Sequence, residues 1–426
     1  MNNIKSLILG KDKDGQITRL LFFIPILFII LSVIYEPNIL ELIKGLIKII
    51  STEDRLFTDY FVLAKEGAAY LNAGLVTLIF AIIIKLVKPN LNGMALAAQY
   101  MTAGFAFMGI DITNVWPIYL GVFIYSKFRK EEFKNYIYMA MLLADLGPFV
   151  SEIYFIENLH LIYSIPLGIL GGLVIGFIVV PLAQFTNVVN KGYNLYNIGF
   201  ASGLLAIVVA SAFKLFGHDL SKQSLIYEGS NLTQLIILSI ISVVFVIYGL
   251  LIGNDNVKGF VKIIKDSGRA PSDFVIKYGV GPTIINMGLA GLVTTLFLVI
   301  TKAQVSGGLL YAGYLSVLGF SAFGKQVRSI TYIYVGALVC SLLGLFDLSS
   351  ATIGMCVMLG TAVSPIGGHY GMVAGMISIL VHLTIVTNLA PLHGNCVLYN
   401  NGFAAGFVAM ILVPIIDGIR GGFNRD

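Results

Sequence analysis

Long apolar runs recur along the chain, and short polar segments separate each run from the next. The first run begins near Thr18, and comparable runs continue almost to the C-terminus without a large polar domain between them. A run of about 20 apolar residues is long enough to cross the hydrocarbon core of a bilayer as a helix. The pattern therefore predicts an all-α integral membrane protein.

About fourteen such runs are distinguished, seven in each half of the chain. In the first half they lie at about 18–35, 67–88, 93–110, 115–127, 136–156, 163–186 and 196–214. In the second half they lie at about 232–252, 281–302, 307–323, 330–346, 350–363, 367–389 and 397–417. After the first run of each half, Leu40–Ile50 and Val257–Ile264 place lysines four residues apart among apolar residues. That spacing is typical of a helix that lies in the membrane interface.

The second half of the chain repeats the first, at an offset of about 215 residues that falls to 203 toward the end of the copy, where the second copy is shorter by roughly a dozen residues. The matched segments are Thr18–Leu21 with Thr233–Ile236, Lys44–Ile50 with Lys258–Ile264, Thr58–Tyr60 with Ser272–Phe274, Asn72–Leu75 with Asn286–Leu289, and Tyr196–Gly203 with Tyr399–Gly406. Apolar composition alone does not produce colinear matches of Lys, Asp, Asn and Tyr, so an internal duplication is predicted. We divide the chain into a cytoplasmic N-terminal segment (1–16), a first membrane repeat (17–222), a second membrane repeat (223–418) and a cytoplasmic tail (419–426).

Composition and charge agree with this interpretation and add an orientation. The chain is 57% hydrophobic and only 12% charged, which excludes an ordinary soluble domain. Seven spans per copy oblige the two copies to face opposite ways, and 20 of the 27 Lys and Arg residues then fall on the side of the two termini. The positive-inside rule makes that side cytoplasmic. Six spans per copy would instead give parallel repeats.

Inverted repeats are typical of secondary transporters, whose solute sites lie where interrupted helices meet near the midplane. The third run of each copy fits an interrupted helix because a glycine pair precedes a polar cluster. The glycine pairs are Gly104 with Gly109 and Gly319 with Gly324, and the clusters contain Asp111 in the first copy and Lys325 with Arg328 in the second. Two interpretations stay open: close helix packing by small residues, or a backbone that opens at the glycines to bind the solute.

The seventh run of each copy begins with a Tyr-Asn pair, Tyr196-Asn197 in one and Tyr399-Asn400 in the other. Their hydroxyls and amides are candidates for hydrogen bonds to a polar solute. The alternative is that they cap the helices and lie at the interface.

Asp145 lies within the fifth run, and an acid at membrane depth is costly unless it is protonated, paired or hydrated. We therefore select Asp145, together with Asp111, as candidates for proton or cation coupling. The histidines His369, His382 and His393 are spread without ligand spacing, and core or interface roles are expected for them. The cysteines also lack metal-ligand spacing, and no metal or cofactor is predicted.

The paired Lys-Gly-x-x-Lys-Ile-Ile and Tyr-Asn-x-Gly-Phe-Ala elements resemble those of a family of uncharacterised bacterial multi-pass proteins, known only by a duplicated domain of unknown function. That resemblance implies a bacterial inner membrane but no activity. The seven-plus-seven architecture is similar to that of nucleobase and sulfate transporters, whose third and tenth spans are interrupted, although their sequence motifs are absent.

The function predicted is a secondary-type transporter of a small polar or anionic solute, and not an enzyme. The alternatives are a channel for a small neutral solute and a membrane-embedded enzyme acting on a lipid-linked substrate. Expected partners are the bilayer, the solute and a coupling proton or cation. A homodimer is left open, and no nucleic acid is expected.

Overall fold

The computed structural model describes residues 12–54, 58–156, 159–218, 220, 225–253, 255–393, 398 and 400–423. Within these ranges the regular elements are helices, accompanied by three isolated β-bridges. The first half contains α2 (Lys13–Tyr35), α3 (Ile39–Ile50), α4 (Tyr60–Val87), α5 (Gly93–Phe105), α6 (Trp116–Phe128), η1 (Phe133–Asn135), α7 (Ile137–Leu142), η2 (Leu143–Leu146), α8 (Gly147–Tyr154), α9 (Leu161–Asn190) and α10 (Asn197–Leu215).

The second half contains α11 (Leu232–Leu251), α12 (Asn256–Lys265), α13 (Phe274–Tyr278), α14 (Val280–Thr301), α15 (Gly307–Phe320), α16 (Val327–Leu342), α17 (Ala351–Gly360), η3 (Thr361–Val363), α18 (Ser364–Tyr370), α19 (Met372–Val386), η4 (Ala390–His393) and α20 (Asn400–Phe423). The order of elements repeats that of the first half, from a long helix and a short amphipathic one onward.

Nine helices in the described ranges are long and apolar enough to cross a membrane. They are Lys13–Tyr35, Tyr60–Val87, Ile137–Tyr154, Leu161–Asn190, Asn197–Leu215, Leu232–Leu251, Val280–Thr301, Ala351–Tyr370 and Asn400–Gly421. The other five expected spans appear as the shorter helices α5, α6, α15, α16 and α19. The membrane character is thereby established, while the count of fourteen spans stays a prediction.

Two expected boundaries were wrong. The run predicted at 136–156 is present as one span, Ile137–Tyr154, which the 3-10 turn η2 interrupts. The run predicted at 350–363, by contrast, continues as α18 to Tyr370. The run predicted from 367 begins instead at Met372, because Gly371 has a φ of +100° and interrupts the helix. Both stretches keep the mean hydropathy of a candidate span, so hydropathy alone does not show these turns.

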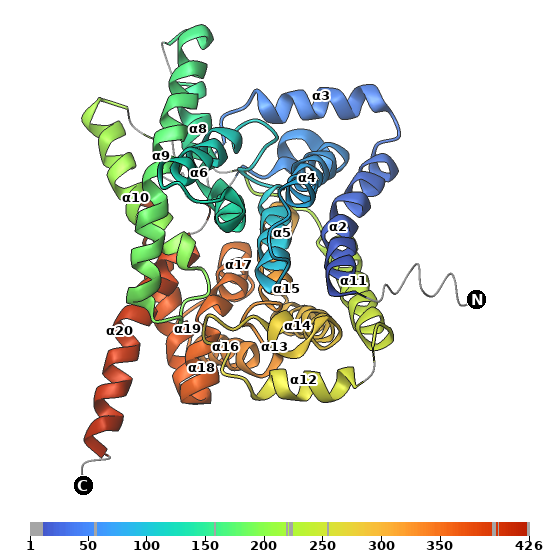
Figure 1. The fold of residues 1–426 in the computed structure, drawn as a ribbon, viewed down its shortest axis with the longest axis vertical. Coiled ribbons are helices and arrows are strands. Elements are labelled where there is room, and N and C mark those ends of the chain that lie inside the picture. Colours follow the sequence, from blue (N-terminus) through green and yellow to red (C-terminus); the bar gives the residue numbers. More distant parts are fainter. Residues whose placement is uncertain are drawn as a thin grey trace.

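The two predicted interfacial helices are present as α3 and α12, and they lie at opposite edges of the molecule (Figure 1). Each presents exposed apolar side chains, Ile43 and Ile47 on α3 and Val257 and Val261 on α12. Each also packs one glycine, Gly45 or Gly259, against the long helix that follows it.

A buried asparagine holds the C-terminal end of the third expected span, α5 in the first copy and α15 in the second. Asn72 of α4 donates from Nδ2 to the carbonyl oxygens of Ala106 and Ile110, at 2.8 and 2.9 Å. Asn286 of α14 donates to those of Ser321 and Lys325, both at 2.8 Å. These acceptors follow helices α5 and α15, where the backbone leaves helical geometry and its carbonyls need partners. The repeated amide therefore fixes the same turn in both copies.

Helices α5 and α15 lie side by side and run in opposite directions. The N-terminal Gly308 of α15 packs on the carbonyl oxygen of Phe107 after α5, and the N-terminal Gly93 of α5 packs on that of Ala322 after α15. An aspartate from the other copy caps each N-terminus: Asp59 accepts from Gly308 N and Asp273 accepts from Gly93 N, both at 2.8 Å. The two copies thus exchange equivalent contacts across one interface.

Candidate functional site

A cavity of about 290 Å³ lies where the two copies meet. Its lining comprises Met94, Met101, Met139, Leu142, Ala183, Gln184, Asn187, Asn194, Leu195, Tyr196, Asn197, Ile198, Gly199, Ala270, Pro271, Phe320 and Phe323. We call this space the inter-repeat cavity. Its lining is apolar apart from four amides and one tyrosine, and it contains no charged side chain. Four larger hollows, of about 310, 410, 680 and 860 Å³, lie elsewhere in the described part of the chain.

Lys325 lies directly behind the wall of this cavity. Its side chain is fully buried, and Nζ donates to the hydroxyl oxygen of Tyr196 at 2.5 Å. The same ammonium lies 4.5 Å from the centroid of the Tyr196 ring and 5.8 Å from that of Phe320, in the geometry of cation–π contacts. None of the ion pairs between described residues includes Lys325. Within the described part of the chain, the fold therefore buries a lysine side chain that has no acidic partner.

The local sequence explains the position of Lys325. Helix α15 ends at Phe320, and Gly324 adopts a φ of +100°. Residues with a β-carbon rarely adopt this backbone conformation, so glycine suits the position. The turn brings the Lys325 amide back to the carbonyl oxygen of Phe320, at 3.0 Å, while its own carbonyl accepts from Asn286. The side chain is thus directed from a rigid turn toward Tyr196.

Tyr196 is held by the segment that precedes α10. Asn194 accepts from the Tyr196 amide at 2.8 Å and donates to the carbonyl oxygen of Gly402 at 3.1 Å. The Leu195 amide donates to the carbonyl oxygen of Ala362, at 3.1 Å. Backbone of the second copy therefore fixes a first-copy segment, which places the Tyr196 hydroxyl against Lys325.

The other members of the Tyr-Asn elements lie differently. Asn197 lines the cavity, but its amide donates to the carbonyl oxygen of Ala183 and accepts from Asn190, both at 2.9 Å. Asn400 is buried away from the inter-repeat cavity and is hydrogen-bonded to His393. Tyr399 lies outside the described residues. Of the four predicted residues, Tyr196 and Asn197 lie at the cavity.

The four glycines divide between the two interpretations. Gly104 packs against the Tyr311 carbonyl oxygen, and Gly319 packs against Tyr100 and Ala97, so these two allow α5 and α15 to approach closely. Gly109, with a φ of +73°, and Gly324 lie in the turns where the helices end. The predicted Arg328 is half-buried in the first turn of α16 and does not line the cavity.

Asp145 is fully buried in the turn η2 that interrupts its span. Ser202 of α10 donates to Oδ1 at 3.1 Å, and Oδ2 has no hydrogen-bond partner among the described residues. A buried carboxyl group without a full set of partners is a candidate for binding a proton.

Asp111 belongs to a separate polar cluster. It accepts from the Thr113 amide and hydroxyl at 2.5 Å, and from the Asn114 amide at 3.0 Å. Asn114 and Tyr60 each donate to Asp54 at 2.9 Å. Burial raises the pKa of Asp54 well above its ordinary value, and the neighbouring Asp111 carboxyl raises it further. Sequence analysis missed Asp54 because it lies in a polar segment that resembles an ordinary connecting loop.

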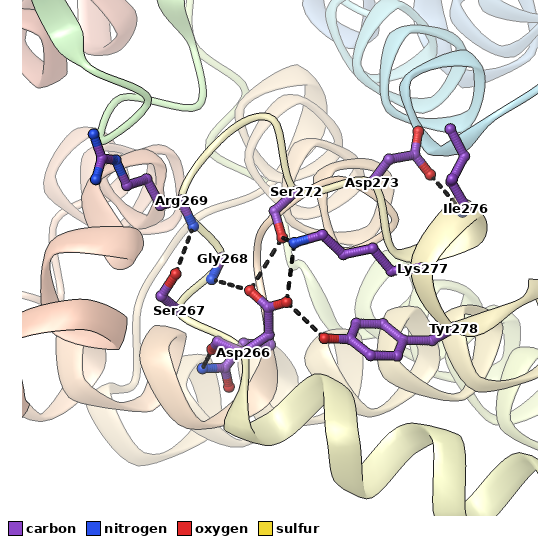
Figure 2. A network of polar contacts seen from close by, with 10 residues as sticks. Asp266, Ser267, Gly268, Arg269, Ser272, Asp273, Ile276, Lys277 and Tyr278 are labelled. Atoms are coloured by element: carbon purple, nitrogen blue, oxygen red, sulfur yellow. Dashed lines mark hydrogen bonds and ion pairs between the residues drawn. The ribbon is translucent and has the colours of Figure 1, made fainter.

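A second network that the sequence analysis missed supports the cavity wall formed by Ala270 and Pro271. Figure 2 shows Asp266 at its centre, accepting from the Gly268 amide at 2.8 Å, Ser272 at 3.1 Å, Tyr278 at 2.7 Å and Lys277 at 3.2 Å. The Asp266 carboxylate thereby connects the two ends of segment 266–278, which contains Ala270 and Pro271. Sequence position gave no indication of it, because the donors lie up to twelve residues away.

The Asp266 network predicts a pH-dependent stability. Burial alone would raise the pKa of Asp266, but hydrogen bonds from Tyr278, Gly268 and Lys277 lower it below its ordinary value. The stabilisation is therefore present above the pKa of the unfolded carboxyl, about 4, and is lost as pH falls through the lower folded value. We expect Asp266→Asn to cost about 1 kcal/mol at neutral pH, and this difference from wild type to shrink below about pH 4.

Thermal unfolding in detergent between pH 3 and 8 measures this difference. Asp255→Asn is the matched control, because its carboxylate pairs with Lys258 at the surface and should contribute little. A wild-type advantage over Asp266→Asn that stays constant down to pH 3 would contradict the assignment.

Comparison with known proteins identifies a family but no activity. The model of a family described as "Protein of unknown function (DUF1576)" matches residues 38–215 and 252–418. No curated protein and no solved structure matches the chain. The two matched regions correspond to the two copies of the duplication.

Proposed function

The chain belongs to the DUF1576 family, whose function is unknown, and from its geometry we propose that it is a secondary-type membrane transporter of a small polar or anionic solute. The observation that carries this proposal is the fully buried Lys325, which has no ion-pair partner among the residues that the structure describes, beside a cavity between two repeats. An uncompensated cation inside a membrane protein is costly, and such groups mark solute and ion pathways.

We propose further that the two repeats face opposite ways in the bilayer. The antiparallel packing of α5 and α15 supports this, because equivalent helices run in opposite directions when a two-fold axis lies in the membrane plane. The placement of Lys and Arg supports the same arrangement, with both termini cytoplasmic. Two similar halves of opposite orientation can exchange conformations and so open a shared site to either side.

Asp145 is the proposed coupling group. It lies in a broken helix that contacts α10, and α10 begins beside Tyr196 of the inter-repeat cavity. Movement of α10 during solute binding would alter the Ser202 hydrogen bond and hence the affinity of the Asp145 carboxyl for a proton. The second copy has Ala362 at the corresponding position in the sequence, so coupling through this group is one-sided.

A channel for a neutral solute is the second candidate, and the absence of charged side chains from the cavity lining favours it. A channel does not need a titrating carboxyl group. Coupling of solute flux to a proton gradient therefore distinguishes a transporter from a channel.

The test is flux into proteoliposomes of the purified full-length protein, with a broad panel of labelled anions and neutral solutes under an imposed proton gradient. We expect saturable uptake with accumulation against the solute gradient, and Asp145→Asn should lower accumulation at least tenfold while exchange at equal concentrations persists. Asp347→Asn is the matched control, since Asp347 lies in a loop after α16 and bonds locally to Ser349.

Two results would count against these proposals. Uncoupled flux that is identical in wild type and Asp145→Asn would favour the channel. A correctly folded protein that moves no solute of the panel would overturn transport altogether.

A further inference from the structure

The balance of charge around the inter-repeat cavity restricts the kind of solute that fits there. The cavity lining contains no acidic residue, and Lys325 contacts one of its lining residues, Tyr196, from behind. A cationic solute would meet an unpaired ammonium and no carboxylate. An anion would instead provide the partner that the buried lysine lacks.

Tyr196 connects the lysine to the cavity. Its hydroxyl oxygen accepts the hydrogen bond from Lys325, while the tyrosine itself lines the cavity. A phenol oxygen that accepts one hydrogen bond still has a proton to donate. Binding of an anion in the cavity requires the Tyr196 hydroxyl to donate to it, and the adjacent ammonium would strengthen that bond because charge-assisted and linked hydrogen bonds reinforce one another.

The remaining walls favour an apolar body. Methionine side chains, Leu142 and the rings of Phe320 and Phe323 form much of the lining, and the flexible thioethers of methionine adapt to varied apolar shapes. A volume of about 290 Å³ holds roughly ten non-hydrogen atoms at the packing of liquid water. The amides of Gln184 and Asn187, on exposed positions of α9, add neutral polar groups.

The number of cations sets the charge of the solute. Among the described residues no lysine or arginine lines the cavity, Lys325 contacts it through Tyr196, and the first copy has Ile110 at the position that matches Lys325. A second negative charge would lie in an apolar, uncharged lining without a partner, which is unfavourable. The site thus fits one negative charge.

We propose that the solute is a monovalent anion with an apolar body, such as a small carboxylate, whose charged group is bound by the Tyr196 hydroxyl with Lys325 behind it. This inference rests on the proposed transport function and specifies its substrate class.

The test compares isosteric probes on the full-length protein in lipid nanodiscs. Benzoate, benzamide and benzamidine have nearly the same shape but carry negative, zero and positive charge, and phthalate adds a second negative charge. Calorimetry and thermal shift should show benzoate binding at least tenfold tighter than the other three, with short- and medium-chain fatty acids binding in the same manner. Benzamide or benzamidine binding as tightly as benzoate, or no carboxylate of the series binding, overturns the proposal.

Variants then test whether Lys325 provides the positive charge that selects benzoate. Lys325→Met should weaken benzoate binding at least tenfold, Tyr196→Phe about tenfold, and Lys325→Arg only a few-fold because the charge is kept. Lys258→Met is the control, since its side chain is exposed on α12. The Arg and Phe variants preserve size and so guard against loss of folding, which unfolding curves monitor. Unchanged benzoate binding in both Lys325→Met and Tyr196→Phe refutes the assignment.

Flux measured with the same probes separates the two proposals. Charge-selective binding that depends on Lys325, in a protein that moves no probe, would retain the binding inference and overturn transport. Flux of neutral solutes that Lys325→Met leaves unchanged would retain transport and overturn the anion site.

Discussion

Asn286→Ala is expected to destabilise the protein by about 3 kcal/mol or more. The side chain donates to the Ser321 and Lys325 carbonyl oxygens and accepts from the Val327 amide at 3.3 Å, so its loss leaves two buried backbone groups and one part-buried one without this partner. Each unpaired group costs about 1–3 kcal/mol. Equilibrium unfolding in mixed detergent, monitored by far-ultraviolet circular dichroism, measures the loss of unfolding free energy.

The duplication provides a second variant for comparison. Asn72 makes the same contacts in the first copy, including acceptance from the Ile112 amide at 3.2 Å, so Asn72→Ala should destabilise the protein by a similar amount. Only Asn286→Ala should also weaken benzoate binding, because only its turn contains Lys325. Asn388→Ala should change the stability little, because the Asn388 side chain is exposed just after the end of α19. Equal stability of Asn286→Ala and Asn388→Ala would contradict this account of the turns.

Gly104→Ala and Gly319→Ala should each destabilise the packing of α5 on α15 by about 1–3 kcal/mol. A β-carbon at 104 would lie 2.7 Å from the Tyr311 carbonyl oxygen, and one at 319 would lie 2.8 Å from the Tyr100 Cβ. All residues of α15, and all of α5 except Met94, are buried, so neither helix can shift without disturbing the other contacts between the copies. Thermal unfolding in detergent reports the change.

Gly418→Ala makes the same substitution where no atom lies within 4 Å of the new β-carbon. It should be neutral or slightly stabilising, because alanine has the higher helix propensity. If Gly104→Ala and Gly319→Ala behaved like Gly418→Ala, the close approach of the two helices would not matter for stability.

The candidate site shows how far linear patterns reach. Lys325 and Tyr196 were selected separately, one as part of a polar cluster after a glycine pair and the other as part of a repeated Tyr-Asn element. Their contact was not predicted, because 129 residues separate them in the chain. The equivalent elements differ where the structure describes them: Ile110 stands at the position of the lysine, and Asn400 bonds to His393.

Residues of connecting segments were the least predictable. Asp54 and Asp266 follow the interfacial helices α3 and α12, and sequence composition suggests solvated loops there. Folding buries Asp54 completely and surrounds Asp266 with donors from its own segment. A charged residue in a polar segment has the same sequence pattern whether water or the fold provides its partners, so only the packing distinguishes the two cases.

The sequence by itself determined that this protein lies in a membrane and that its chain is duplicated. Both are properties of linear order: hydrocarbon thickness sets the length of an apolar run, and a duplication preserves the order of its residues. Only the tertiary structure decided where helices break and which side chains meet. The lysine behind the cavity wall depends on a turn held by Asn286 and on a loop held by the opposite copy. Those contacts join distant parts of the chain, and no local pattern encodes them.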